Sequence, residues 1–245
     1  MVRCVVALPD GRIVSGSADC SLRVWDSSNG RCLQTLEGHS QGVNCVAVLP
    51  DSRIVSGSDD GSLRVWDSSD WQCIQTLEGH SGGVRRVVVL SDGRIVSDSY
   101  GVYLHVWDSS DGRCLQILKG HSILITCMAV LPDGRIVSGS VDHSLRIWDS
   151  SVGQCLQTLE GHSEEVTCVA VLPDGSIVSG SADGLIKIWD ADTGKCKVTI
   201  EKSEIDVSHM DLSNAILTKD IAKLLWQNGA TISKADYEKY IHKEV

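Results

Sequence analysis

The chain has 245 residues, of which 42% are hydrophobic and 22% are charged, a balance that is typical of a folded domain and excludes a disordered or collagen-like chain. Its formal net charge of -10 disfavours nucleic acid and anionic membrane surfaces as partners, because both carry negative charge. The ten cysteines form no CxxC pair, and no apolar run has the length of a signal peptide or a membrane span, so we expect a reduced, cytoplasmic protein.

A unit of 41 residues recurs along most of the chain. Each copy contains a Trp-Asp pair, and the tryptophans are Trp25, Trp66, Trp107, Trp148 and Trp189. Gly-His pairs keep the same spacing and end at His39, His80, His121 and His162. One supersecondary unit has therefore been copied in tandem five times.

Each unit predicts four short antiparallel strands separated by turn residues. In the second copy the segments are VNCVAVL, RIVSGS, SLRVW and CIQTL, within residues 43–77. The first is almost continuously apolar, which indicates burial on both faces, whereas the last two alternate as half-exposed strands do. Such sheets cannot cover their own faces, so we expect them to stack around an axis.

The Gly-His pair, the Pro-Asp-Gly turn, the Ser-Gly-Ser-x-Asp turn and the final Trp-Asp resemble the WD repeat, and the resemblance covers about four-fifths of the chain. It implies an all-β fold, a β-propeller of about five four-stranded blades within residues 1–200. The blades are expected at about residues 2–42, 43–83, 84–124, 125–165 and 166–200.

Residues 201–245 lie outside the repeats. The spacing of Leu217, Ile221 and Leu224 predicts a helix, and Ser233 with Asp236 resembles the start of a second one. A degenerate sixth blade is the alternative. Five copies leave the closure of the ring open: a five-bladed ring, an open arc that pairs with a second chain as a homo-oligomer, and a ring completed by residues 201–245 all fit the pattern.

Serine, histidine and aspartate recur from unit to unit, but a catalytic triad is needed only once. The resemblance to WD repeats implies that these side chains and the tryptophan form a buried structural network. The residues carried over are His39, Ser58, Asp60 and Trp66 in blade 2; His80, Ser99 and Trp107 in blade 3; His121, Ser140, Asp142 and Trp148 in blade 4; and His162, Ser181, Asp183 and Trp189 in blade 5. A second serine lies two residues before each of these serines, and the sequence leaves open which of the two joins the network.

Two further patterns follow the repeat. Arg12 and Asp26, with their equivalents in the next three copies, are predicted to pair across two strands, and Asp190 to lack that partner because Ser176 takes the arginine position. The phased cysteines are expected to be small core residues. No catalytic residue, metal site or cofactor is expected.

Blade 3 departs most from its siblings. It carries arginines in its first strand, tyrosines in and after the turn between its second and third strands, and a histidine at an arginine position, and aliphatic residues precede blade 4. These loops and turns share one rim in a propeller, so we predict a partner-binding surface there. Its residues are Arg85, Arg86, Tyr100, Tyr103, His105, Ile123 and Leu124. Neutral drift, or repacking around the aspartate replaced by Gly101, is the alternative.

The function that this reading favours is a non-catalytic scaffold that binds proteins or peptides on the propeller rim. One alternative is an adaptor that recruits a substrate to a larger complex such as a ubiquitin ligase, with residues 201–245 docking to the complex. A hydrolase with an axial site is a third, and it lacks support because no GxSxG, HExxH or GxxxxGK[ST] motif occurs.

Overall fold

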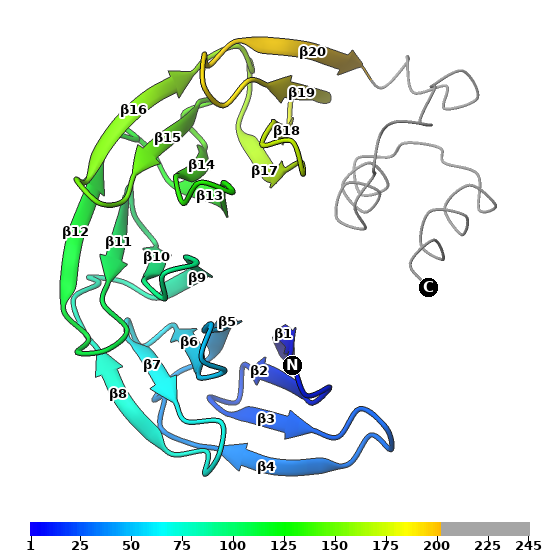
Figure 1. Ribbon diagram of the computed structural model, residues 1–245, viewed down its shortest axis with the longest axis vertical. Coiled ribbons are helices and arrows are strands. Elements are labelled where there is room, and N and C mark those ends of the chain that lie inside the picture. Colours follow the sequence, from blue (N-terminus) through cyan, green and yellow to red (C-terminus); the bar gives the residue numbers. More distant parts are fainter. Residues whose placement is uncertain (202–245) are drawn as a thin grey trace. The chain divides into compact units, whose positions relative to one another are not determined.

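The computed structural model describes residues 1–201, which form five four-stranded antiparallel sheets (Figure 1). In each sheet the strands lie side by side in chain order, so every hairpin joins neighbouring strands. The all-β architecture with about five four-stranded blades is therefore confirmed. The predicted helical pair, and the sixth blade that was its alternative, lie outside the described residues.

The strand bounds follow the repeat. Blade 1 contains β1 (Val2–Ala7), β2 (Ile13–Ser17), β3 (Leu22–Trp25) and β4 (Cys32–Leu36). Blade 2 contains β5 (Val43–Val48), β6 (Ile54–Ser58), β7 (Leu63–Trp66) and β8 (Cys73–Leu77). Blade 3 contains β9 (Val84–Val89), β10 (Ile95–Ser99), β11 (Tyr103–Trp107) and β12 (Cys114–Lys119). Blade 4 contains β13 (Ile125–Val130), β14 (Ile136–Ser140), β15 (Leu145–Asp149) and β16 (Gln154–Leu159), and blade 5 contains β17 (Val166–Val171), β18 (Ile177–Ser181), β19 (Leu185–Trp189) and β20 (Cys196–Glu201).

The Pro-Asp-Gly segments close the first hairpin of a blade. In blade 1 the amide of Leu8 donates to the carbonyl of Arg12, and the amide of Gly11 donates back to Leu8 at 3.0 Å. Gly11 has φ +87°, a conformation that glycine adopts without the steric cost of a Cβ. Ser52 takes this position in blade 2 with φ +72°. The turn chemistry therefore sets where the first strand ends and the second begins.

The chain forms two compact units. The first is Met1–Ile125 with Asp149–Cys155, and the second begins at Thr126. Within the first unit, blade 1 packs face to face against blade 2: Leu22 and Val24 share a buried cluster with Val43 and Trp66. β4, β8 and β12 run along one side of this unit, and β1, β5 and β9 run along the opposite side (Figure 1).

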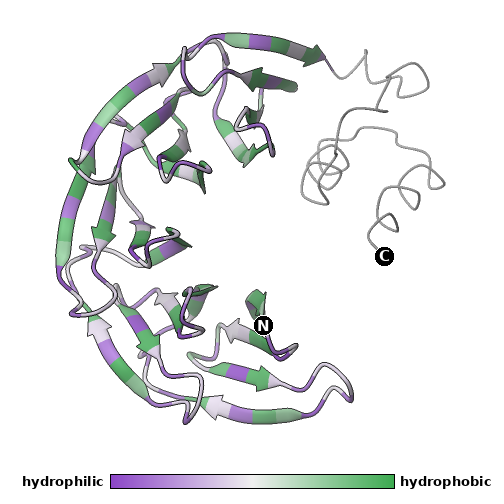
Figure 2. Cartoon of the chain, viewed as in Figure 1, coloured by the Kyte–Doolittle hydropathy of each residue, from purple (hydrophilic) through white to green (hydrophobic). Residues whose placement is uncertain are grey.

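In the second unit the same packing joins blades 4 and 5. Leu145 and Ile147 of blade 4 share a buried cluster with Val166 and Trp189 of blade 5. Burial of one aliphatic side chain of this size contributes about 1.5–3 kcal/mol, so such clusters supply most of the cohesion between neighbouring sheets. Figure 2 shows the complementary pattern on β12 and β16, where hydrophobic and hydrophilic residues alternate along strands that face solvent on one side.

A glycine in the second strand lets adjacent blades approach closely. A Cβ on Gly57 would lie 2.5 Å from Cγ1 of Val84 and 2.6 Å from Sγ of Cys45. Gly16 and Gly139 meet the equivalent valine and cysteine at nearly the same distances. The valine of each following blade therefore fills the space that the glycine leaves open.

The predicted pairing of Arg12 with Asp26 is wrong. Arg12 pairs with Asp10 of its own turn at 2.6 Å and also donates to the carbonyl of Ser68 in blade 2. Asp26 accepts hydrogen bonds from the amide and hydroxyl of Ser28 and so closes its own turn. The arginine is long enough to reach the next blade, and there it satisfies a backbone carbonyl that a cross-strand pair would leave without this donor.

The same arrangement recurs in the next three blades. Arg53, Arg94 and Arg135 each pair with the aspartate two residues earlier, and each donates to a backbone carbonyl 56 residues later at 2.8–2.9 Å. Asp190 is not left without a partner, because Lys197 pairs with it at 3.0 Å and replaces the missing arginine.

The cysteines differ in burial, and five of the ten are partly buried. Cys45 and Cys127, in first strands, are buried as predicted, and burial raises the pKa of the Cys45 thiol well above its usual range. Cys32, Cys114 and Cys196 lie on fourth strands and are exposed, so the prediction of core positions is wrong for these three. None of the ten cysteines, all of which lie within the described residues, forms a disulfide.

We expect Gly57→Ala to destabilise the protein by about 1–3 kcal/mol, because the added methyl group overlaps Val84 and Cys45 in a closely packed interface. Adding Val84→Ala should recover part of that loss, since it removes the group that the methyl group meets. Urea unfolding of both variants measures this. Gly82→Ala is the matched control, because its Cβ would lie at an ordinary 3.6 Å from Tyr100. Equal losses for Gly57→Ala and Gly82→Ala would contradict the packing argument.

Candidate functional site

A hydrogen-bonded chain of four side chains lies inside blade 2. The indole Nε1 of Trp66 donates to Oγ of Ser56 at 2.8 Å. The same hydroxyl lies 2.8 Å from Nε2 of His39, and Nδ1 of His39 lies 2.9 Å from Asp60. These hydrogen bonds connect the third strand, the second strand and the turn after it to the loop at residues 37–42, which leads into the blade. We call this loop, and its equivalents in the other blades, the lead-in loop.

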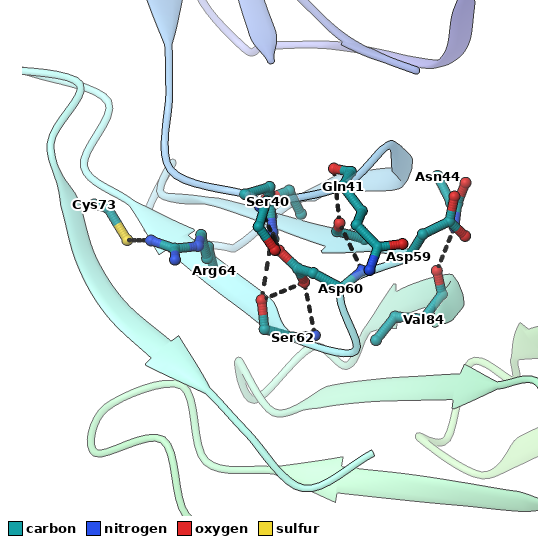
Figure 3. A network of polar contacts seen from close by, with 12 residues as sticks. Ser40, Gln41, Asn44, Asp59, Asp60, Ser62, Arg64, Cys73 and Val84 are labelled. Carbon is teal, nitrogen blue, oxygen red and sulfur yellow. Dashed lines mark hydrogen bonds and ion pairs between the residues drawn. The ribbon is translucent and has the colours of Figure 1, made fainter. Parts of the chain in front are cut away.

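Asp60 is held in place by several donors (Figure 3). The backbone amide of Ser40 donates to one carboxylate oxygen at 2.9 Å, and the hydroxyl and amide of Ser62 donate to the other. Burial alone would raise the pKa of Asp60, but the hydrogen bonds from Ser62 and His39 hold it at about 2. Burial lowers the pKa of His39, so the ring is neutral at neutral pH and donates one hydrogen bond to the carboxylate.

The serine in this chain is the earlier of the two candidates. Ser56 is fully buried, and its hydroxyl contacts Trp66 on one side and His39 on the other. Ser58 instead donates to the carbonyl of Gln41 and accepts from the amide of Asp60, so it ties the turn to the lead-in loop. Both serines support the same loop geometry through different bonds.

Blade 5 repeats the arrangement. His162 lies 2.8 Å from both Asp183 and Ser179, and Trp189 donates to Ser179 at 2.8 Å. Ser181 donates to the carbonyl of Glu164, as Ser58 does to Gln41.

Blade 4 follows the same scheme at two points. Trp148 donates to Ser138 at 2.8 Å, and the amide of Asp142 donates to Ser140. His121 is buried in this blade.

Blade 3 has a different network. His80 contacts Ser97 at 2.7 Å and Trp107 donates to the same hydroxyl, but Gly101 stands where siblings have aspartate. The imidazole of His105 fills the space, with its ring centre 4.1 Å from that of His80 and its plane stacked on Trp107. Burial lowers the pKa of His80 to about 3. The prediction that His105 lies on the partner-binding surface is wrong, because its side chain fills this gap and is 9% exposed.

A second predicted surface residue also turns inward. Arg86 pairs with Asp98 at 2.9 Å, and the carboxylate of Asp98 is fully buried. These two residues replace the cysteine and glycine that siblings use for close packing, such as Cys45 and Gly57. Arg86 therefore belongs to an internal ion pair, and the sequence analysis overlooked Asp98 as its partner.

The remaining predicted residues are exposed or half-buried. Arg85 sits over the ring of Tyr100, 5.0 Å from its centre, and Tyr100 is 62% exposed. Ile123 is 48% exposed, and Leu124 is half-buried. We call Arg85, Tyr100, Ile123 and Leu124 the blade 3 patch. Tyr103 is exposed at the start of β11, where it contacts Lys119.

Backbone hydrogen bonds hold the blade 3 patch together. The amide of Tyr100 donates to the carbonyl of Gly83 in the lead-in loop of its own blade at 3.2 Å. The amide of Ile125, directly after the lead-in loop of the next blade, donates to the carbonyl of Gly101 at 3.3 Å. The turn that carries Tyr100 is thus fixed between two lead-in loops.

Sequence reasoning missed a polar cluster between blades 1 and 2. Arg3 pairs with Asp59 at 2.5 Å and donates to Asn44, and Asn44 also donates to Asp59. Figure 3 shows Asn44 close to both Asp59 and Val84. The signal was present in the alignment of the copies, because Arg3 and Arg85 occupy the same repeat position.

One cavity lies between blades 4 and 5 within the second unit, with a volume of about 280 Å³. Arg135 and Lys197 line it, and both are paired with aspartates of the same cavity, Asp133 and Asp190. Among residues 1–201, no group of three or more histidine, cysteine or acidic side chains is placed to hold a metal ion. Nor does this part of the chain contain a helix that is long and apolar enough to cross a bilayer.

The Asp98 carboxyl makes the stability of blade 3 dependent on pH. Burial raises its pKa to about 6, so between about pH 4 and pH 6 the folded state binds a proton more tightly than the unfolded chain does. The free energy of unfolding of the native protein should therefore fall, relative to that of Asp98→Asn, by up to about 3 kcal/mol as the pH rises from about 4 to 7.

Urea unfolding at a series of pH values measures this difference. The double variant Arg86→Cys with Asp98→Gly, which restores the residues of the siblings, is the control and should lack this pH-dependent component. A constant difference between native protein and Asp98→Asn would show that Asp98 titrates normally.

The comparisons with known proteins agree with this geometry. The family model described as "WD domain, G-beta repeat" matches residues 1–26, 30–67, 71–108, 112–149 and 153–190. F-box/WD repeat-containing protein 7 of Drosophila melanogaster is 62% identical over 32 residues, which are 13% of this chain and 2% of that protein. The probable E3 ubiquitin ligase complex SCF subunit scon-2 of Neurospora crassa is 50% identical over 36 residues, 15% of this chain and 6% of that protein.

A third relative has a different role in its name. Ribosome biogenesis protein bop1-A of Xenopus laevis is 45% identical over 47 residues, 18% of this chain and 6% of that protein. In these three comparisons the chain spans only 2–6% of the length of the relative, so each likeness is to about one repeat. The five family matches, by contrast, cover most of the chain, and we conclude that it belongs to the WD40 repeat family.

Proposed function

We propose that the protein is a non-catalytic interaction scaffold that binds a protein segment at the blade 3 patch. The observation that carries the proposal is the exposed ring of Tyr100, supported by Arg85 and next to the lead-in loop that carries Ile123. Tyrosine and arginine are enriched where protein interfaces concentrate their binding energy, and an aliphatic neighbour adds apolar area.

The contrast with the sibling blades supports this assignment. Asp59 and Asp60 stand in blade 2 where Tyr100 and Gly101 stand in blade 3, and both aspartates are engaged in internal hydrogen bonds. In blade 3 the corresponding turn carries no internal carboxylate contact and presents an aromatic ring to solvent instead. Because the turn is held by backbone bonds, the ring is presented without a large loss of conformational freedom on binding.

The recurring histidine and serine support a structural role rather than catalysis. Ser56, Ser97 and Ser179 are buried and lie between a tryptophan and a histidine. A nucleophile must reach a substrate, and these hydroxyls face the interior. A net charge of -10 supports protein partners over nucleic acid or a membrane surface.

A second candidate function is that of an adaptor within a larger complex, and the names of two relatives favour it: an F-box/WD repeat-containing protein and a probable ubiquitin ligase subunit. In that case residues 201–245 would dock to the complex. Removing them should abolish co-purification with the complex while peptide binding at the blade 3 patch persists. Retention of the complex by the shortened chain would exclude the adaptor role for this segment.

We expect Tyr100→Ala combined with Ile123→Ala to weaken peptide binding about tenfold or more, because a tenfold loss needs only about 1.4 kcal/mol and both exposed side chains are removed. The probes are peptides selected on the native protein from a displayed library of random linear peptides, and fluorescence polarisation measures their affinity. Leu33→Ala is the control, since Leu33 is also about half exposed but lies on β4. Undiminished affinity of the double variant would refute the assignment.

A further inference from the structure

We infer that Arg85 binds a carboxylate of the partner segment, next to an apolar side chain that Tyr100 and Ile123 receive. This inference rests on the proposed function and specifies the chemistry of its partner. Arg85 is the second residue of the first strand of its blade, and the other copies show which contacts this position makes.

In two siblings this residue holds the next blade. The side chain of Asn44 donates to the carbonyl of Val84 at 2.9 Å, and that of Thr126 donates to the carbonyl of Val166. In both cases the acceptor is the first residue of the following blade's first strand. In these two blades the position therefore serves the packing of adjacent sheets.

In blade 3 a different residue makes the contact with the following blade. Arg86, one position later, donates to the carbonyl of Ile125 at 3.3 Å, which is the equivalent acceptor. The guanidinium of Arg86 also donates to the carboxylate of Asp98 at 2.9 Å. Because Arg86 makes the hydrogen bond to Ile125, Arg85 is not needed for it, and its guanidinium lies over the ring of Tyr100.

The guanidinium of Arg85 forms no ion pair within residues 1–201, and the one nearby carboxylate, that of Asp98, is already paired with Arg86. Arg3, at the same position in blade 1, is neutralised by Asp59 of the neighbouring turn. The residue 56 positions after Arg85, as Asp59 is after Arg3, is Val141, so the sequence offers Arg85 no acid at that position. A guanidinium whose face rests on an aromatic ring keeps its N–H groups free to bind a carboxylate in a bidentate manner.

The local charge therefore differs from that of the whole chain. The protein carries -10 overall, but the blade 3 patch presents one cation that forms no ion pair within the described residues, beside the exposed side chains of Tyr100 and Ile123. A segment with an aspartate or glutamate beside an aliphatic or aromatic residue matches both features. The surrounding negative charge would in turn disfavour segments that are acidic throughout.

The test uses the full chain and the displayed library of random linear peptides. Peptides selected on the native protein should carry an acidic residue next to an apolar one. Arg85→Thr introduces the residue found at the same position in blades 4 and 5, so it should fold normally, and it should lower the affinity of these peptides about tenfold. Replacing the acidic residue of the peptide by its amide should cause a similar loss on the native protein and no further loss on Arg85→Thr.

Arg113→Thr is the matched control, because it removes the same charge from a 75% exposed arginine outside the patch, and it should leave affinity unchanged. Selection of peptides without acidic residues, or full affinity of Arg85→Thr, would overturn the inference. If Tyr100→Ala with Ile123→Ala then still abolishes binding, the proposed function stands without it. If neither change affects binding, both the inference and the proposed function fail.

Discussion

A buried indole with one polar atom is the constraint on which each repeat depends. Trp66 and Trp189 fill the space between adjacent sheets, and an indole N–H in such a place must find an acceptor because water cannot reach it. Ser56 supplies that acceptor in blade 2, and its own hydrogen needs the ring of His39. His39 then needs Asp60, so a single apolar packing requirement extends into a polar chain that fixes the turn and the lead-in loop.

Blade 3 shows what happens when one member of that chain is replaced. Gly101 removes the carboxylate that would receive His80, and the gap is filled by His105 and stacked aromatic contacts. A second replacement, in which Arg86 and Asp98 stand in place of cysteine and glycine, introduces a buried ion pair at the face that siblings pack with small residues. The two changes together leave Tyr100 and Arg85 at the surface, and this connects the internal repacking to the proposed binding function.

The sequence of blade 3 fits a selected binding surface, neutral drift, or repacking around the aspartate that Gly101 replaces. The structure shows that several of its departures are coupled: Arg86 needs Asp98, and the release of Arg85 follows from Arg86. Drift in one residue would leave the other without a partner, at the cost of a buried unpaired charge. Coupled replacement explains why the predicted surface divided into an internal part, Arg86 and His105, and an exposed part that includes Tyr100 and Ile123.

The sequence by itself determined the number of repeats, the four strands of each repeat, and the types of residue that form the buried network. These follow from local periodicity and turn chemistry, which act over a few residues and repeat 41 residues apart. Only the tertiary structure decided between Ser56 and Ser58, and it showed Asp10 in place of the predicted Asp26 as the partner of Arg12. In both cases two residues lie close together along the strand or turn. The indole of Trp66 and the ring of His39 meet at Ser56, and Arg12 reaches the carbonyl of Ser68 in the next blade, so each outcome depends on three-dimensional contacts that the spacing of the residues does not record.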